Sequence, residues 1–137
     1  MHQFNINTLD HVAIRVKNME KSIQWYNEVL GLKTYRVPKW KNFPIFLLSG
    51  KTGVALFPAN VEDPVLNHQS HNVKIDHYAF NVSNLDFAKA RKHYDSLGLS
   101  YDFQDHYYFH SIYTRDPDGH VVELTTLVVS EDEFYDL

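Results

Sequence analysis

The sequence contains no cysteine, few residues that break regular structure and no long hydrophobic run. The lack of cysteine among its 137 residues excludes thiol nucleophiles, disulfide bonds and cysteine-type zinc sites. Only 5 glycines and 5 prolines are present, which excludes a collagen-like or low-complexity chain. No segment approaches the ~20 apolar residues of a membrane-spanning helix. The first residues lack the basic and then apolar order of a signal peptide, so we expect a cytoplasmic protein.

Positive charge is also scarce, because the sequence has 13 lysines and arginines but 17 acidic residues, which gives a net charge of -4. Binding to nucleic acid or to an anionic membrane requires clustered basic side chains, so neither is expected as a partner. Hydrophobic residues are plentiful at 44%, and this favours a single folded domain over residues 1–137. Histidine, the commonest metal ligand, occurs 9 times.

The chain repeats itself at a spacing that grows slowly from 66 to 68 residues. The aligned segments are 9–19 with 75–85, 30–32 with 97–99, and 54–56 with 122–124. Three blocks in the same order predict two copies of one module, over residues 8–58 and 74–128. A polar connector then covers 59–73. An acidic tail covers 129–137 and is either loose or docked through its aromatic residues.

Each module is predicted to fold as a strand, a helix and three further strands. Alternating residues give the first strand of each module one apolar face and one small or polar face, which carries His11 or His77. The predicted helix caps are Asn18 and Asn84 at the N-termini and Gly31 and Gly98 at the C-termini. The later strands are expected over 33–37, 44–49 and 53–58, and over 100–104, 108–114 and 120–127. The fold class is therefore α+β, with two paired βαβββ modules whose mixed sheets curve around a shared cleft.

Three side chains with ligand chemistry fall on strands of this repeat. If the two modules pair about a pseudo-twofold axis, His11 and His77 occupy equivalent positions, and Glu123 is equivalent to Ala55. Two imidazoles and one carboxylate with open positions suit Fe(II) as well as Mn, Co, Ni or Zn. The alternatives are a strand-edge role for Glu123 and a degenerate site that has lost its metal.

Four stretches of the sequence resemble the vicinal-oxygen-chelate superfamily. This superfamily includes glyoxalase I, extradiol ring-cleaving dioxygenases, fosfomycin-resistance thiol transferases and bleomycin-resistance proteins. The stretches are 9–16, 25–32, 76–80 and 113–124. The last is the most specific, because Asp116-Pro117-Asp118-Gly119 forms a tight turn before the strand that carries the terminal carboxylate. The resemblance implies the fold described above and a homodimer, with the site built either within one chain or across the two chains.

The resemblance also implies a ligand set and a metal. Its metal ligands fall on His11, His77 and Glu123, whereas the fourth ligand of some members falls on Ala55, which cannot bind metal. This departure counts against strict glyoxalase I activity. One divalent metal per site is expected, with Fe(II) or Mn(II) favoured and Zn, Ni or Co as alternatives.

Four further residues are candidates for catalysis or substrate binding. Tyr113 precedes Glu123 by ten residues, as a tyrosine does in extradiol enzymes and thiol transferases, although it could equally pack in the core. His110 is the predicted acid or base, but its strand parity is opposite to that of Tyr113 unless a bulge intervenes, and His106 is a similar candidate. Arg15 matches an arginine that binds a substrate carboxylate in glyoxalase-like members, and its alternative is a surface ion pair.

The sequence therefore predicts a metal-dependent enzyme that binds a small substrate through two adjacent oxygens. Extradiol-type dioxygenase chemistry is favoured, with a glyoxalase-like lyase or isomerase and a thiol transferase as alternatives. A third alternative is a metal-free protein that binds a small aromatic compound or an antibiotic. This alternative predicts a large aromatic groove between subunits. The candidates to line a pocket for a planar substrate, with core packing as their commoner role, are Trp40, Phe43, Phe46, Phe57 and Phe103.

Overall fold

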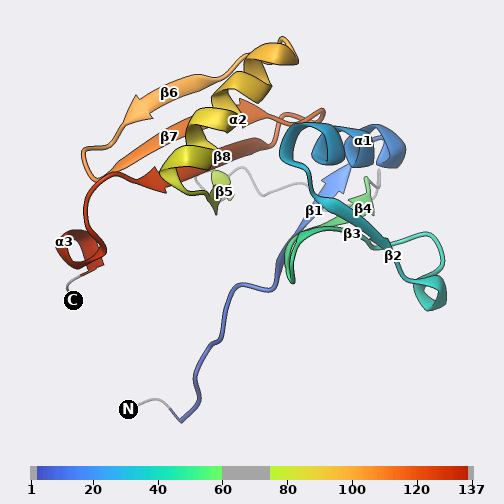
Figure 1. Cartoon of the computed structure of the whole chain (residues 1–137). Helices are drawn as coiled ribbons and strands as arrows, with labels where there is room; N and C mark the ends of the chain where they lie inside the picture. The colour runs from blue at the N-terminus through green and yellow to red at the C-terminus, as the bar shows by residue number, and fades with distance from the viewer. Residues whose placement is uncertain (1–2, 60–74, 136–137) are drawn as a thin grey trace, which may run out of the picture. The chain divides into compact units, whose positions relative to one another are not determined.

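A computed structural model describes residues 3–59 and 75–135, which fall into two compact units (Figure 1). Unit 1 is Met1–Pro64 and unit 2 is Val65–Leu137. Each unit contains one four-stranded mixed sheet and one long helix in the order βαβββ, which confirms the fold class. The predicted connector lies outside the described residues except for Ala59. The single-domain organisation over 1–137 stays a prediction.

Unit 1 contains a sheet in the order β1-β4-β3-β2. Its elements are β1 (His11–Val16), α1 (Met19–Leu30), β2 (Lys33–Arg36), the short 3-10 helix η1 (Pro38–Trp40), β3 (Ile45–Ser49) and β4 (Thr52–Pro58). Strands β1 and β4 are parallel, and the other pairs are antiparallel. The helix α1 buries Ile23, Tyr26 and Val29, and the sheet buries alternate residues such as Leu47, Val54 and Leu56.

Unit 2 repeats this plan with the order β5-β8-β7-β6. Its elements are β5 (His77–Asn81), α2 (Asn84–Ser96), β6 (Asp102–Asp105), β7 (Phe109–Arg115), β8 (Val121–Leu127) and α3 (Glu131–Tyr135). Helix α2 lies across one face of the sheet, over buried Ile112, Val122 and Leu124 (Figure 1). In the described part of the chain, no helix is long and apolar enough to cross a bilayer.

Of the two predicted N-terminal helix caps, one is right and the other is wrong by one residue. The Asn18 side chain accepts a hydrogen bond from the backbone N–H three residues later, as expected at the start of α1. At α2 the capping residue is Ser83, and Asn84 is the first helical residue. The Asn84 side chain accepts a hydrogen bond from Thr126 on β8 at 2.8 Å. The Asn84 side chain, which the local pattern predicted as a helix cap, therefore makes a tertiary hydrogen bond instead.

Two kinds of glycine are required by this backbone. Gly31 and Gly98 end α1 and α2 with φ angles of 66° and 65°, as predicted. Gly53 pairs with His11 across β1 and β4, and a Cβ there would lie 2.1 Å from the carbonyl oxygen of Leu47. The backbones of β3 and β4 therefore approach each other beside His11 so closely that only glycine fits at this position.

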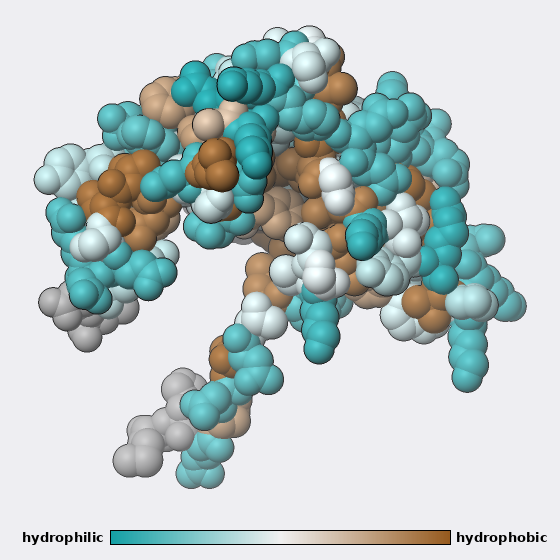
Figure 2. Space-filling model, viewed as in Figure 1, coloured by the Kyte–Doolittle hydropathy of each residue, from teal (hydrophilic) through white to brown (hydrophobic). Residues whose placement is uncertain are grey.

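The acidic tail docks through an aromatic residue, which is one of its two predicted alternatives. The Phe134 ring on α3 lies 4.7 Å from the Phe109 ring and 5.2 Å from the Tyr108 ring. Figure 2 shows hydrophobic residues gathered where the end of the unit 2 sheet meets α3. The tail thus packs on the turn that connects β6 with β7.

The Tyr94 hydroxyl is buried without a hydrogen-bond partner among the described residues, and this burial raises the pKa of Tyr94. Because an unsatisfied buried hydroxyl is costly, we expect Tyr94→Phe to raise the free energy of unfolding by about 1 kcal/mol in urea titration. Tyr94→Ala, which also loses ring packing against Tyr101, should lower it by about 3 kcal/mol. A lower stability for Tyr94→Phe would mean that the hydroxyl does have a partner.

Candidate metal centre

Strand register brings three predicted site residues to one face of the unit 2 sheet. Glu123 on β8 pairs with Ala79 on β5 and with Tyr113 on β7. His77 lies two residues before Ala79, so its side chain points to the same side as Glu123 and Tyr113. The neighbouring residues on these strands face α2 and form the core. The polar face of this sheet is therefore the candidate site.

His77 and Glu123 are placed as two ligands of one metal would be. The His77 Nε2 atom lies 3.5 Å from Glu123 Oε2. Two donors that bind one metal at about 2.1 Å lie about 3.0 to 3.4 Å apart in octahedral or tetrahedral geometry. The Glu123 side chain is only 10% exposed, and a buried carboxylate requires a compensating cation or hydrogen-bond donor. This pair of donor atoms therefore fits a divalent metal.

Both candidate histidines are oriented by the aspartate that precedes them. His77 Nδ1 lies 2.7 Å from Asp76 Oδ2, and His11 Nδ1 lies 2.6 Å from Asp10 Oδ1. A carboxylate only accepts hydrogen bonds, so Nδ1 carries the proton and Nε2 keeps its lone pair. Metal-binding histidines almost always donate their second ring N–H to a carboxylate, a backbone carbonyl or water, and an aspartate is one such partner. Sequence reasoning assigned no role to these aspartates, although the repeated Asp-His pair was a signal for it.

Unit 1 carries the histidine of this arrangement but not its partners. Ala55 occupies the register position of Glu123, and Phe46 occupies that of Tyr113. The Phe46 ring meets the His11 ring edge to face at 5.1 Å. Unit 1 therefore offers one donor, set against an apolar aromatic surface. The offset of 67 residues between Phe46 and Tyr113 matches the repeat and could have identified this pair.

The predicted triad is divided between the units, with His11 in unit 1 and His77 and Glu123 in unit 2. Within residues 3–59 and 75–135, no three histidine or acidic side chains gather into a metal-binding group. The His77–Glu123 pair is the part of the triad that lies within one unit. The complete ligand set stays a prediction.

Tyr113 lies between a histidine and the candidate carboxylate. Its hydroxyl lies 3.0 Å from His106 Nε2, and Tyr113 pairs with Glu123 across β7 and β8. Burial, followed by the nearby Glu123 carboxylate, raises the pKa of Tyr113 to about 12, and Ser111 acts in the opposite direction. The phenol thus keeps its proton at neutral pH.

The predicted acid or base His110 lies on the other face of the sheet. Strand β7 pairs with β8 continuously along its length, so His110 stays opposite Thr126 with a parity that points toward α2. Its Nε2 atom lies 3.6 Å from Asp105 Oδ1, and its ring lies 5.3 Å from the Phe103 ring. The structure therefore does not bring His110 to Glu123, whereas it does bring His106 to Tyr113.

Arg15 shares a face of β1 with His11, four residues earlier. Its Nη1 atom donates to the Pro58 carbonyl at 3.1 Å, and its guanidinium lies 5.4 Å from the centre of the Phe57 ring. The arginine is thus held against the sheet edge of unit 1. Its predicted role in substrate binding stays a prediction.

The aromatic residues predicted as pocket candidates do not all lie in the same place. Four belong to unit 1, and one lies on the α2 side of the unit 2 sheet. Trp40 and Phe43 are about half exposed and lie next to Phe46 and Phe57 respectively, at ring distances of 5.5 and 6.1 Å. Phe103 has the strand parity of the α2 side of unit 2. The first four therefore remain candidates for contact with a ligand, and Phe103 does not.

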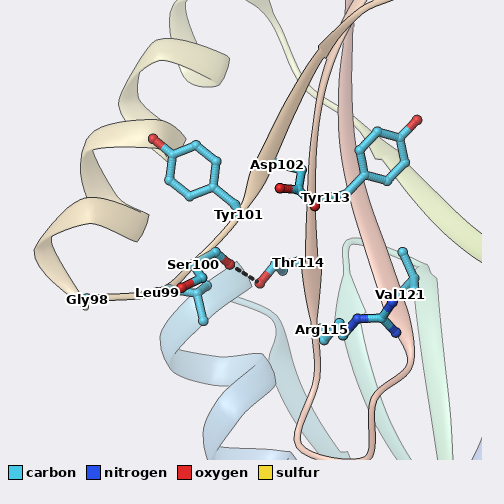
Figure 3. Close-up of a pocket in the computed structure, with 9 residues that line it drawn as sticks. All are labelled: Gly98, Leu99, Ser100, Tyr101, Asp102, Tyr113, Thr114, Arg115 and Val121. Carbon is cyan, nitrogen blue, oxygen red and sulfur yellow. Dashed lines mark hydrogen bonds between the residues drawn. The ribbon is translucent and has the colours of Figure 1, made fainter.

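An open pocket of about 480 Å³ lies at the end of the unit 2 sheet, beside the loop between α2 and β6 (Figure 3). Thr114 Oγ1 donates to the Ser100 carbonyl at 3.1 Å on one side of β7. Tyr113 and Arg115 project to the other side, as Figure 3 shows. Neither His77 nor Glu123 is among the described residues that line this pocket. The candidate site is therefore identified by the donor atoms of His77 and Glu123 and not by this pocket.

The raised pKa of Tyr113 gives a spectroscopic prediction. We expect the tyrosinate absorbance of the wild type minus that of Tyr113→Phe to titrate near pH 12, above the usual value of 10. Because the folded-state pKa is raised, the Tyr113 contribution to stability should be complete below pH 10 and lost as pH rises toward 12. A difference titration near pH 10 would contradict the buried contact with Glu123.

Similar proteins agree with this architecture. Glutathione transferase FosA of Serratia marcescens is 29% identical over 119 residues, which are 87% of this chain and 80% of that protein. A probable trivalent organoarsenical cleaving enzyme of Bacillus subtilis is 30% identical over 80% of this chain and 73% of its own length. An integron cassette protein from the mobile metagenome of a Halifax Harbour sewage outfall has 31% identity and a TM-score of 0.68, covering 89% of this chain and 100% of its own. A family model matches residues 8–124, and the chain belongs to the Glyoxalase/Bleomycin resistance protein/Dioxygenase superfamily.

Proposed function

We propose that this chain is a metal-dependent enzyme that binds a small substrate through two adjacent oxygens. The observation that carries the proposal is the 3.5 Å separation of an oriented imidazole nitrogen, His77 Nε2, from the buried carboxylate of Glu123. A protein that only binds a small molecule without metal has no need for an aspartate behind each histidine. The superfamily assignment supports the same conclusion, since its members typically hold a divalent metal.

His77 and Glu123 would hold the metal together with His11, which comes from the same chain or from a second copy in a homodimer. A divalent ion at this position supplies Lewis-acid stabilisation of negative charge that develops on the substrate oxygens. Fe(II) or Mn(II) is the expected ion, and Zn, Ni and Co remain alternatives because histidine and carboxylate ligands suit all of them.

The chain itself contributes proton control and orientation. Tyr113 keeps its proton at neutral pH and pairs with Glu123 across β7 and β8, so a neutral phenol lies beside this ligand. Asp76 and Asp10 fix the tautomers of His77 and His11. Arg15, on the His11 face, is the proposed contact for an anionic group of the substrate.

Two reactions are candidates for this site. Extradiol-type ring cleavage is favoured by the sequence, since a site with three protein ligands leaves positions for both substrate oxygens. Thiol transfer is favoured by the similarity to glutathione transferase FosA over 87% of this chain. The short segment 103–106 contains no lysine or arginine, which separates this chain from thiol transferases that bind a phosphonate there.

Metal content tests the ligand set. We expect about one equivalent of Mn(II) or Fe(II) per chain in the wild type, measured by elemental analysis after anaerobic loading and gel filtration. His11→Ala, His77→Ala and Glu123→Gln should each lose most of it. His110→Ala is the matched control, because this histidine lies on the opposite face and should leave the metal content unchanged. Equal metal content in all of these proteins would contradict the proposal.

Substrate trials distinguish the two reactions. With Fe(II) loaded anaerobically, a dioxygenase should consume oxygen and form a yellow product when catechols and air are added. With Mn(II), a thiol transferase should consume glutathione in the presence of an electrophile, measured as loss of free thiol. Glu123→Gln should abolish whichever activity is found, and an activity that survives this substitution would point to a different site.

A further inference from the structure

Arg115 lies on the same face of the unit 2 sheet as the two proposed metal ligands. It pairs with Val121 on β8, which in turn pairs with His77 on β5, so these three residues form one row across the sheet. Glu123 follows Val121 by two residues and is the diagonal neighbour of Arg115 on this face. Neighbouring strands are about 4.8 Å apart, so the row spans only about 10 Å. One small substrate can therefore reach from the donors to the guanidinium.

Arg115 also lines the open pocket of about 480 Å³ at the end of this sheet. Tyr113, the strand partner of Glu123, lines it too, and both side chains project to the same side of β7 (Figure 3). The pocket thus adjoins the row of donors. Asp102 is the acidic residue of the lining, but it lies on β6, one strand further from Glu123, and its exposure allows water to screen its charge.

The turn after β7 orients the Arg115 side chain without depending on it. Arg115 Nη1 donates to the Gly119 carbonyl at 3.1 Å. The turn itself is closed by the buried Asp116 side chain, which accepts from the backbone N–H groups of Asp118 and His120, both at 2.9 Å. A guanidinium carries five N–H groups, so the bond to the carbonyl leaves donors for a two-point contact with a carboxylate.

We propose that Arg115 binds a carboxylate of the substrate while two adjacent oxygens of the same molecule lie at the metal. The pocket beside Arg115 is then the subsite for the acid group, and the substrate class is a small carboxylic acid. Arg15, the arginine predicted from the sequence, belongs to unit 1, whereas Arg115 shares one sheet with His77 and Glu123. This inference rests on the proposed function, because the carboxylate is placed relative to a proposed metal.

The affinities of two chelators test this subsite. Catechol has two adjacent oxygens, and 3,4-dihydroxybenzoate adds a carboxylate on the far side of the ring. Isothermal titration calorimetry of the Mn(II)-loaded protein without oxygen gives the ratio of the two affinities. We expect Arg115→Gln to lower the preference for the acid about tenfold relative to wild type, because a charge-assisted two-point contact is lost. Arg115→Lys, which keeps the charge but not the fork, should lower it by less.

The comparison between variants cancels the direct effect of the carboxylate on the acidity of the diol. Arg91→Gln is the matched control, because Arg91 lies on α2, on the opposite face of the sheet, 4.7 Å from the centre of the Phe103 ring. Its preference for the acid should equal that of wild type. Thermal unfolding should confirm that each variant folds, and Arg115→Lys carries the test if Arg115→Gln does not.

The outcomes separate this inference from the proposed function. An unchanged affinity ratio in the Arg115 variants, including an equal loss of affinity for both compounds, would overturn this inference alone. An equal fall of the ratio in Arg91→Gln would also overturn it. A wild type that binds neither compound would overturn the proposed function and this inference with it.

Discussion

The parallel pairing of β5 with β8 decides where every polar group of unit 2 points. It aligns Ala79 with Glu123, and the antiparallel pairing of β8 with β7 then adds Tyr113 to the same row. A shift of one residue would turn Glu123 toward α2 and bury it among apolar side chains, so the core of the unit fixes the register of the site. The positions of the polar side chains on this face are thus determined by the hydrophobic packing on the opposite face.

The two units use one backbone plan for different purposes. Both keep an aspartate that orients a histidine on the first strand. On the neighbouring strands, unit 2 has a carboxylate and a phenol where unit 1 has Ala55 and Phe46. Both copies of the repeat therefore keep the imidazole in the same position. The neighbouring strands differ, because they carry polar side chains in unit 2 and an apolar aromatic surface in unit 1.

Alternation of apolar residues and the internal repeat were enough to predict the strands, the helices and the face that carries His77 and Glu123, because both patterns follow directly from backbone geometry. Asn84 was predicted as the cap of α2 in place of Ser83, because its hydrogen bond with Thr126 joins residues that are distant in sequence. The choice of His106 over His110 depended on a turn with a left-handed tyrosine, which no local rule anticipates. Parity alone already disfavoured His110, and the continuous pairing of β7 agrees with it.

The docking of α3 ties the end of the chain to the turn that presents His106. Phe134 packs on Tyr108 and Phe109, and these two residues also make the backbone hydrogen bonds of that turn. An affinity tag that follows α3 would consequently lie close in sequence to this aromatic contact. Purification handles are better attached at the opposite terminus, where residues 3–10 extend away from β1 with their side chains exposed (Figure 1).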